Sequence, residues 1–230
     1  MTGMLDLWKQ TLTQEFLEEP EVNNLDFLIL LGITLGKQPI LLKNLYKAYL
    51  KEESNFGYKP MIGAALDISF DQSEQQVSFS RAQESVKLTF GQFQKYIGLI
   101  DLLFTDIYPI GTVAELDETL LPPYIQEMYG DSEEGFLVSI HGRRVLTKQE
   151  DEYIDYIATI WPFGLLDDVE LIYLNNVMIK RVVSLGMVND TEKIFVEEVL
   201  RKQLLMKDVY SYLYTDSAMT MNWEVEMNES

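Results

Sequence analysis

The chain has 230 residues, no cysteine, and 37 acidic against 18 basic side chains, so its formal net charge is −19. The lack of cysteine excludes disulfides, thiol catalysis and thiolate zinc sites. The negative charge argues against nucleic-acid binding, which needs cationic groups, and favours a basic protein partner. Residues 1–10 resemble no signal peptide, and the apolar stretch 25–35 is shorter than the ~20 residues of a membrane span, so we expect a cytoplasmic protein without membrane insertion.

The first part of the chain predicts helices. Apolar residues at helical spacing predict a helix over 4–19, which Pro20 ends, and a second helix from Pro39 to Leu50. Segment 25–35 is apolar on all sides, so its pattern fits a buried helix and a central strand equally well. We expect a loop over 51–60, where Ser, Asn, Gly and Pro gather.

A three-stranded antiparallel meander follows. Apolar and polar residues alternate over 62–70, and the polar stretch 71–75 turns the chain back into strands at 77–79 and 86–88. Thr89 and Gln92 then have the spacing of a capping box, which predicts a helix over 90–104. We therefore expect residues 1–105 to form one α+β domain.

The second part predicts strands and then a helix. We expect strands over 110–116, 136–143, 153–160 and 171–185, the last bent into two at Asn175 and Asn176. Asn189 and Glu192 have capping-box spacing at the start of a long helix. The apolar stripe expected on that helix is Phe195, Val199, Leu205, Val209 and Leu213.

The predicted order of elements indicates an α+β fold of antiparallel sheets flanked by helices. The second domain is expected over 106–214. We expect 215–230 to form a disordered acidic tail, because it carries four acids and no basic residue, with Trp223 as its one apolar anchor.

No set of residues indicates catalysis, a metal or a cofactor. His141 is the only histidine, and no nucleophile accompanies it, so a structural histidine is expected. The acidic pairs at 133–134 and 167–168 lack the spacing of a calcium loop, and no glycine-rich nucleotide fingerprint is present. We therefore expect a protein that is not an enzyme, with no catalytic residue, metal or cofactor.

Trp161, Pro162 and Phe163 place two large rings at the end of a predicted strand. We expect the rings to cap the core, and the alternative is a binding anchor. Trp161 and Phe163, together with His141 and Arg143, are the candidate partner-binding residues.

Several short motifs occur in one order along the second half. They are Pro109-Ile110-Gly111-Thr112-Val113, Phe136-Leu137-Val138 with Gly142-Arg143, Asp155-Tyr156-Ile157 with Trp161-Pro162-Phe163-Gly164, and Tyr173-Leu174-Asn175-Asn176 with Gly186. Over about 107–205 the chain thus resembles a small family of domains of unknown function. Its members are encoded beside type VII secretion toxins of Gram-positive bacteria.

The resemblance implies a cytosolic accessory protein that chaperones or targets an LXG-type toxin. The family has no recognised catalytic residue, so none is carried over. This chain departs from the pattern between 117 and 135, where a short turn is lengthened, and it adds a whole N-terminal half.

Three other functions remain open. One is an immunity protein that neutralises the toxin, a role that an acidic surface suits when the target is a cationic nuclease. Another is an uncharacterised hydrolase that uses His141 or the acids Asp167 and Asp168. The last is a structural subunit of the secretion machinery.

Overall fold

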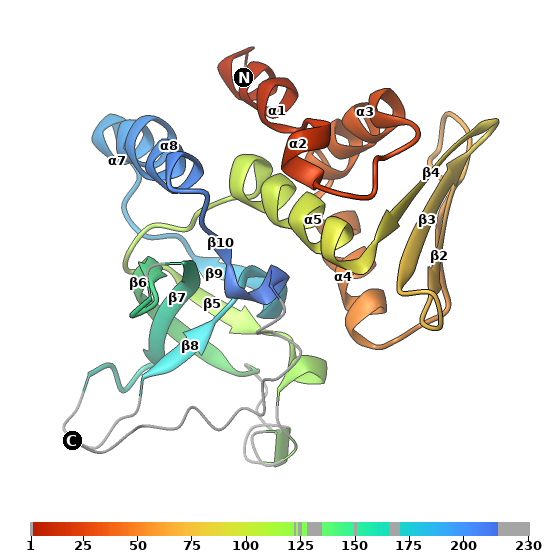
Figure 1. The fold of residues 1–230 in the computed structure, drawn as a ribbon. Helices are drawn as coiled ribbons and strands as arrows, with labels where there is room; N and C mark the ends of the chain where they lie inside the picture. Colours follow the sequence, from red (N-terminus) through yellow and green to blue (C-terminus); the bar gives the residue numbers. More distant parts are fainter. Residues whose placement is uncertain are drawn as a thin grey trace. The chain divides into compact units, whose positions relative to one another are not determined.

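The computed structural model describes residues 2–121, 123, 126–127, 135–149, 151–165 and 171–215. The chain divides into two compact units, Met1–Thr105 and Asp106–Ser230 (Figure 1). Each unit combines one sheet with helices, and nearly all strand pairs are antiparallel. The predicted α+β class is therefore confirmed. The predicted tail over 215–230 lies outside the described residues except for Thr215.

The helices of the first unit follow the predicted pattern with one break. They are α1 (Thr2–Thr11), α2 (Gln14–Leu17), α3 (Leu25–Gly36), α4 (Pro39–Leu50) and α5 (Phe90–Phe104). The prediction of one helix over 4–19 is wrong, because the Thr13 hydroxyl accepts a hydrogen bond from the Phe16 amide (3.2 Å) and starts a second helix. The ambiguous segment 25–35 is a helix, begun by Asn24, whose side chain caps the Phe27 amide.

The first sheet has the strand order β1-β2-β3-β4. Its strands are β1 (Asn55–Tyr58), β2 (Leu66–Asp71), β3 (Gln76–Arg81) and β4 (Glu84–Thr89). The loop predicted over 51–60 is wrong, because it contains β1. The strand predicted from residue 62 begins only at Leu66, since Pro60 and Gly63, the latter at φ 109°, carry the chain out of the ladder.

Helices α3, α4 and α5 cover one face of this sheet, while the other face is polar (Figure 1). Tyr49, Phe70 and Phe93 pack their rings together in the core. At another point of the core the buried Trp8 ring lies against Gly32, where an added Cβ would come within 2.1 Å of the ring. The apolar faces of the helices and strands thus meet in one core.

No single helix in the described part of the chain is long and apolar enough to cross a membrane. Helices α3 and α4 reach that length and composition only as a pair, which is bent by 111°.

The second sheet has the strand order β10-β7-β6-β5-β9, and β8 also pairs with β7. Its strands are β5 (Val113–Leu116), β6 (Leu137–Leu146), β7 (Glu152–Ile160), β8 (Ile172–Leu174), β9 (Ile179–Ser184) and β10 (Tyr210–Ser211). A 3-10 helix (Asn176–Met178) separates β8 from β9, so the predicted bend at Asn175 and Asn176 is confirmed. Among the described strands, only the short β10 runs parallel to its neighbour.

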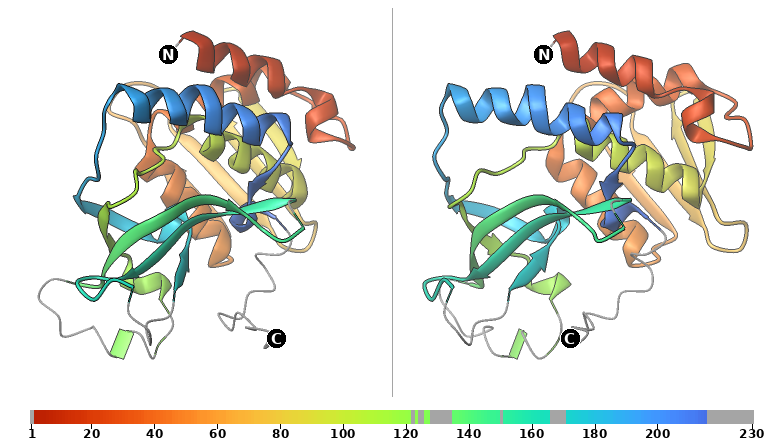
Figure 2. Two further views of the ribbon diagram at one scale, coloured as in Figure 1. Left: turned by 90° about the vertical axis from the view of Figure 1, so that its left-hand side faces the viewer. Right: turned by 60° about the vertical axis from the view of Figure 1, so that its left-hand side comes forward.

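The apolar face of this sheet forms a core of its own. Its buried members include Ala114, Val138, Ile140, Tyr156 and Leu174, one or more from each of four strands. The long hairpin of β6 and β7 (Figure 2) contributes Val138, Ile140, Tyr156 and Ala158 to this core. The pairing register of these two strands fixes the positions of the side chains described below.

The last helix is one continuous rod made of three parts (Figure 2). These are α7 (Asp190–Ile194), a π-helical turn (Phe195–Leu200) and α8 (Arg201–Met206). The predicted apolar stripe is partly wrong, because the wider π turn shifts the register and buries Val196 and Leu204 while Phe195 stays exposed. The helix ends at Met206, so Val209 and Leu213 lie beyond it, although both are buried.

Candidate partner-binding surface

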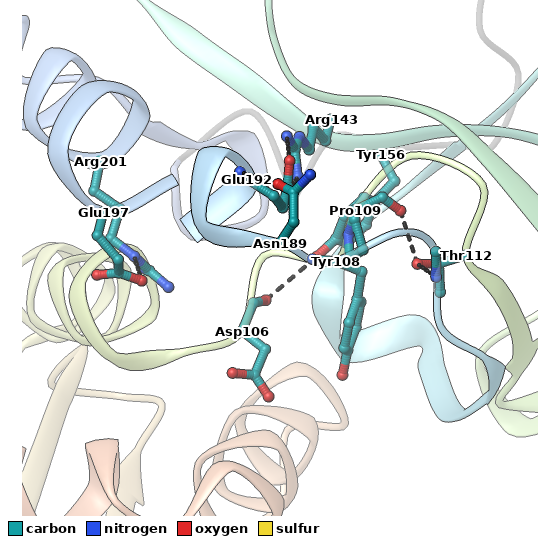
Figure 3. Close-up of polar contacts among 11 residues, drawn as sticks. Asp106, Tyr108, Pro109, Thr112, Arg143, Tyr156, Asn189, Glu192, Glu197 and Arg201 are labelled. Atoms are coloured by element: carbon teal, nitrogen blue, oxygen red, sulfur yellow. Dashed lines mark hydrogen bonds and ion pairs between the residues drawn. The ribbon is translucent and has the colours of Figure 1, made fainter. Parts of the chain in front are cut away.

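The turn over 109–112 is fastened to two neighbouring segments. The Thr112 hydroxyl donates to the Pro109 carbonyl (2.7 Å, Figure 3) and accepts from the Gly186 amide (3.1 Å). Backbone hydrogen bonds join Gly111 and Thr112 to Ile140. Gly186 lies so near the Ile110 carbonyl that an added Cβ would be 2.3 Å from its oxygen. Two motifs that are 74 positions apart therefore meet in one structural contact.

Tyr156 joins β7 to the segment that leads into this turn. Its hydroxyl accepts a hydrogen bond from the Tyr108 amide (3.1 Å) and donates one to the Asp106 carbonyl (3.3 Å, Figure 3). The rings of Tyr108 and Tyr156 are stacked, with centroids 5.9 Å apart. Tyr156 therefore positions the chain rather than presenting its hydroxyl to a ligand.

Arg143 connects β6 to the first turn of α7. Both of its terminal nitrogens donate to the Glu192 carboxylate, one at 2.9 Å, and its guanidinium lies 5.3 Å from the centre of the Phe195 ring. The hydrogen bond from Arg143 lowers the pKa of Glu192. Glu192 therefore does not complete the predicted capping box, although the Asn189 side chain caps the Glu192 amide at 2.9 Å. The Arg143 side chain is largely buried. Its role in partner binding stays a prediction.

A fully buried ion pair joins Arg144 of β6 to Asp155 of β7. The other Asp155 oxygen accepts from the Asn176 amide and the Ser211 hydroxyl, both at 3.0 Å. One carboxylate thus ties together β6, the 3-10 helix and β10. Sequence reasoning missed this pair, although a charged residue at an inward position of each strand was the available signal.

Glu115 of β5 is a second buried acid with basic partners. Its carboxylate accepts hydrogen bonds from Lys180 (2.6 Å) and Arg181 (2.5 Å) of the neighbouring β9. The hydrogen bond from Lys180 is the main reason that the pKa of Glu115 is lowered. An added Cβ on Gly135 would come 2.9 Å from the same carboxylate, so glycine leaves room for it.

His141 occupies a β-bulge of β6. The register between β6 and β7 shifts between Ile140 and Gly142, so His141 is the extra residue. Its Nε2 lies 2.7 Å from the Thr159 hydroxyl, and the residue is exposed. Within the described ranges, no three His, Asp or Glu side chains converge in a way that could hold a metal ion. The acidic pairs at 133–134 and 167–168 lie outside the described residues.

Comparison with known proteins gives one match. Residues 128–195 match the model of a family that is described as a domain of unknown function, DUF4176. No curated protein and no solved structure matches the chain. In the described part of the chain, the matched segment contains β6 to β9 and the first turns of the last helix.

The matched segment exposes both rings of the turn after β7. Trp161 is 41% exposed and Phe163 is 59% exposed, so these rings do not cap the core. Backbone hydrogen bonds from Trp161 to Leu137 (3.0 Å) and from Gly164 to Ile160 (3.2 Å) hold the turn. We name the exposed side chains at this turn and immediately before β8 the Trp161 cluster; they are Trp161, Phe163, Leu165 and Leu171.

A second group of exposed apolar side chains begins in β9, which lies at one edge of the sheet, and continues into the last helix. We name this group the β9 run; it contains Val183, Leu185, Met187, Val188, Ile194 and Phe195. Of the 17 large apolar side chains that are exposed in the described part of the chain, ten belong to these two groups. All ten lie in the matched segment, so most of the exposed large apolar side chains of the described residues fall within it.

Proposed function

We propose that the chain is a cytoplasmic protein-binding factor that chaperones or targets an LXG-type toxin of a type VII secretion system. The observation that carries the proposal is the concentration of exposed apolar side chains in the segment 128–195. The resemblance of the motifs to a family encoded beside such toxins supplies the identity of the partner.

The Trp161 cluster has the features of a protein-binding anchor. Large apolar patches are rare on the surfaces of isolated proteins and usually mark sites of association. Tryptophan is among the residues that contribute most to binding, because a partner that covers its large ring removes much apolar surface from water. Here the rings project from a turn that backbone hydrogen bonds attach to β6 and β7, so little conformational entropy is lost when a partner binds.

The charge of the chain supports a basic partner. A net charge of −19 attracts a cationic protein and speeds its encounter, while the apolar clusters supply short-range contacts. The polar contacts of Arg143, Tyr156 and Asp155 serve to fix the scaffold beneath these clusters.

Co-expression with the toxin encoded beside the gene tests the proposal. We expect one complex of fixed stoichiometry on size-exclusion chromatography. The double variant Trp161→Ser/Phe163→Ser should raise the Kd about 30-fold or more, the factor that corresponds to ~2 kcal/mol lost at a binding hot spot.

The matched control is Met206→Ser. Met206 is exposed to 87% but lies outside the matched segment, so its replacement should leave the Kd unchanged. Toxin and chain that elute separately at micromolar concentration would refute the proposal. Deletion of the gene separates the two toxin-related roles, because lost export indicates a chaperone, whereas self-intoxication indicates an immunity protein.

A further inference from the structure

The first unit carries an exposed apolar tip between β1 and β2. Met61 is fully exposed and Ile62 is 92% exposed, the two highest values among the exposed large apolar side chains of the described chain. The tip is held at both ends by paired strands, because Tyr58 of β1 lies opposite Leu66 of β2 directly beside it. Such a tip costs solubility without contributing to the core, which points to a binding role.

A hydrogen bond joins the base of this tip to the short connection between α3 and α4. The Tyr58 hydroxyl donates to the Gln38 side chain at 2.7 Å. Ile40, exposed to 76%, follows Gln38 by two positions, and Met61 follows Tyr58 by three. The three exposed aliphatic side chains Ile40, Met61 and Ile62 therefore lie at the same end of the unit, and we name them the aliphatic tip.

The surroundings of the aliphatic tip differ in charge from the rest of the molecule. Helices α3 and α4 and the residue after α4 (25–51) contain four lysines and one acid, Asp26 in the first turn of α3, in a chain with twice as many acids as bases. Lys37 and Lys59 are exposed and adjoin Gln38 and Tyr58. Asp67 of β2 and Glu84 of β4 are the acids nearest in the strand register, and Glu84 accepts a hydrogen bond from Asn24 (2.7 Å). At physiological salt only charges within about 8 Å act on a docked surface, so the local lysines matter more than the net charge.

The convex shape of the aliphatic tip favours a lipid surface over a peptide as its binding partner. Side chains that are more than 90% exposed have no neighbouring walls, so they cannot form the groove that an extended peptide or a helix requires. A bilayer surrounds a convex tip and needs no groove. Aliphatic side chains beside lysines are the pattern that enters the interface of an anionic bilayer, with the ammonium groups near the lipid phosphates.

We propose that the aliphatic tip docks reversibly on an anionic membrane surface. Met61 and Ile62 enter the boundary of the acyl chains, while Lys37 and Lys59 contact the anionic headgroups. No helix crosses the bilayer in this arrangement, and a single small tip predicts weak, salt-sensitive binding.

Vesicle co-sedimentation of the full chain tests the proposal. We expect at least fivefold more binding to vesicles of phosphatidylglycerol and phosphatidylcholine than to phosphatidylcholine alone, and loss of the difference in 0.5 M salt. Met61→Asp/Ile62→Asp should reduce binding at least tenfold. The control Met206→Asp/Ile110→Asp places the same two charges on the same two side-chain types in the other unit, at exposed positions outside both named apolar groups, and it should bind like wild type.

The absence of cysteine permits a second measurement. An environment-sensitive fluorophore on Met61→Cys should shift to the blue on anionic vesicles. The same fluorophore on Gln72→Cys, at the opposite end of the six-residue strand β2 and so about 20 Å away, should not shift.

Three outcomes would overturn the proposal. They are equal binding to neutral and anionic vesicles, equal losses in the two double variants, and no shift of the fluorophore at position 61. Full displacement of the chain from vesicles by polyglutamate, without a shift at position 61, would instead assign the lysines to an acidic protein.

Discussion

At the scale of single residues, the buried pair of Arg144 and Asp155 has the largest expected effect. Both side chains are fully buried, and Asp155 also accepts hydrogen bonds from Asn176 and Ser211. Asp155→Ala should therefore lower the free energy of unfolding by about 3–5 kcal/mol, because it leaves the buried guanidinium without its counter-charge. Urea denaturation followed by circular dichroism measures this loss.

The double variant Arg144→Met/Asp155→Leu is the control for this prediction. Apolar side chains of similar volume remove the unpaired buried charge, although the Asn176 amide and the Ser211 hydroxyl still lose their acceptor, so the double variant should regain about half of the lost stability. A loss below about 1 kcal/mol in Asp155→Ala would contradict the prediction and show that water reaches the guanidinium.

The lowered pKa of Glu192 should make the folded protein less stable at acidic pH. Its hydrogen bond from Arg143 lowers the pKa of the folded state below the ordinary value of 4.5. The unfolded chain therefore binds the proton first, so the stabilisation is complete above pH 4.5 and is lost as the pH falls through the folded-state pKa. The stability difference between wild type and Glu192→Gln should shrink steadily on acidification below pH 4.5.

Glu198→Gln is the matched control for Glu192. Glu198 pairs with Lys202 one turn along the helix, but 60% of its side chain is exposed. Exposed pairs of this spacing contribute about 0.5 kcal/mol or less, so its replacement should change stability little at any pH. A pH-independent difference for Glu192→Gln would show that the carboxylate does not act through its charge.

At the scale of elements, the capping box of α5 provides a local test of helix stability. The Thr89 hydroxyl accepts from the Gln92 amide (3.1 Å), and the Gln92 side chain accepts from the Thr89 amide (3.0 Å). Thr89→Ala should cost about 1 kcal/mol of unfolding free energy in urea titrations. Thr34→Ala, which removes a hydroxyl from the interior of α3, should be close to neutral. Equal effects of the two changes would contradict the role of the cap.

Local signals predicted the elements well where they acted within a few residues. The helix over 90–104 and its capping box, the helix from Pro39, and the bend at Asn175 all agree with the structure. Each depends on spacing or turn chemistry that neighbouring residues decide. Segment 25–35 needed one more local signal, the Asn24 cap, to be assigned as a helix.

Predictions failed where distant residues decide the outcome. Strand β1 was missed because its pairing with β2 stabilises a short segment rich in turn residues. The pair of Arg144 and Asp155 depends on the register of the hairpin, which the His141 bulge shifts by one residue. The exposed rings of Trp161 and Phe163 were named as candidates from the sequence, but their exposure depends on how the turn after β7 is held.

At the scale of the whole molecule, charge and apolar surface should affect different steps of partner binding. The net charge of −19 acts at long range, so it should raise the association rate with a basic partner, and salt should screen this effect. Trp161 and Phe163 act only after contact, so their loss should raise the dissociation rate.

Stopped-flow or surface-plasmon kinetics with the co-expressed toxin separate the two steps. We expect the association rate to fall about tenfold or more between 20 mM and 300 mM salt, and to change less than about threefold in Trp161→Ser/Phe163→Ser. An association rate that does not depend on salt would exclude a cationic partner surface. If Trp161→Ser/Phe163→Ser slows association and leaves dissociation unchanged, the rings act in the encounter and not in the bound interface.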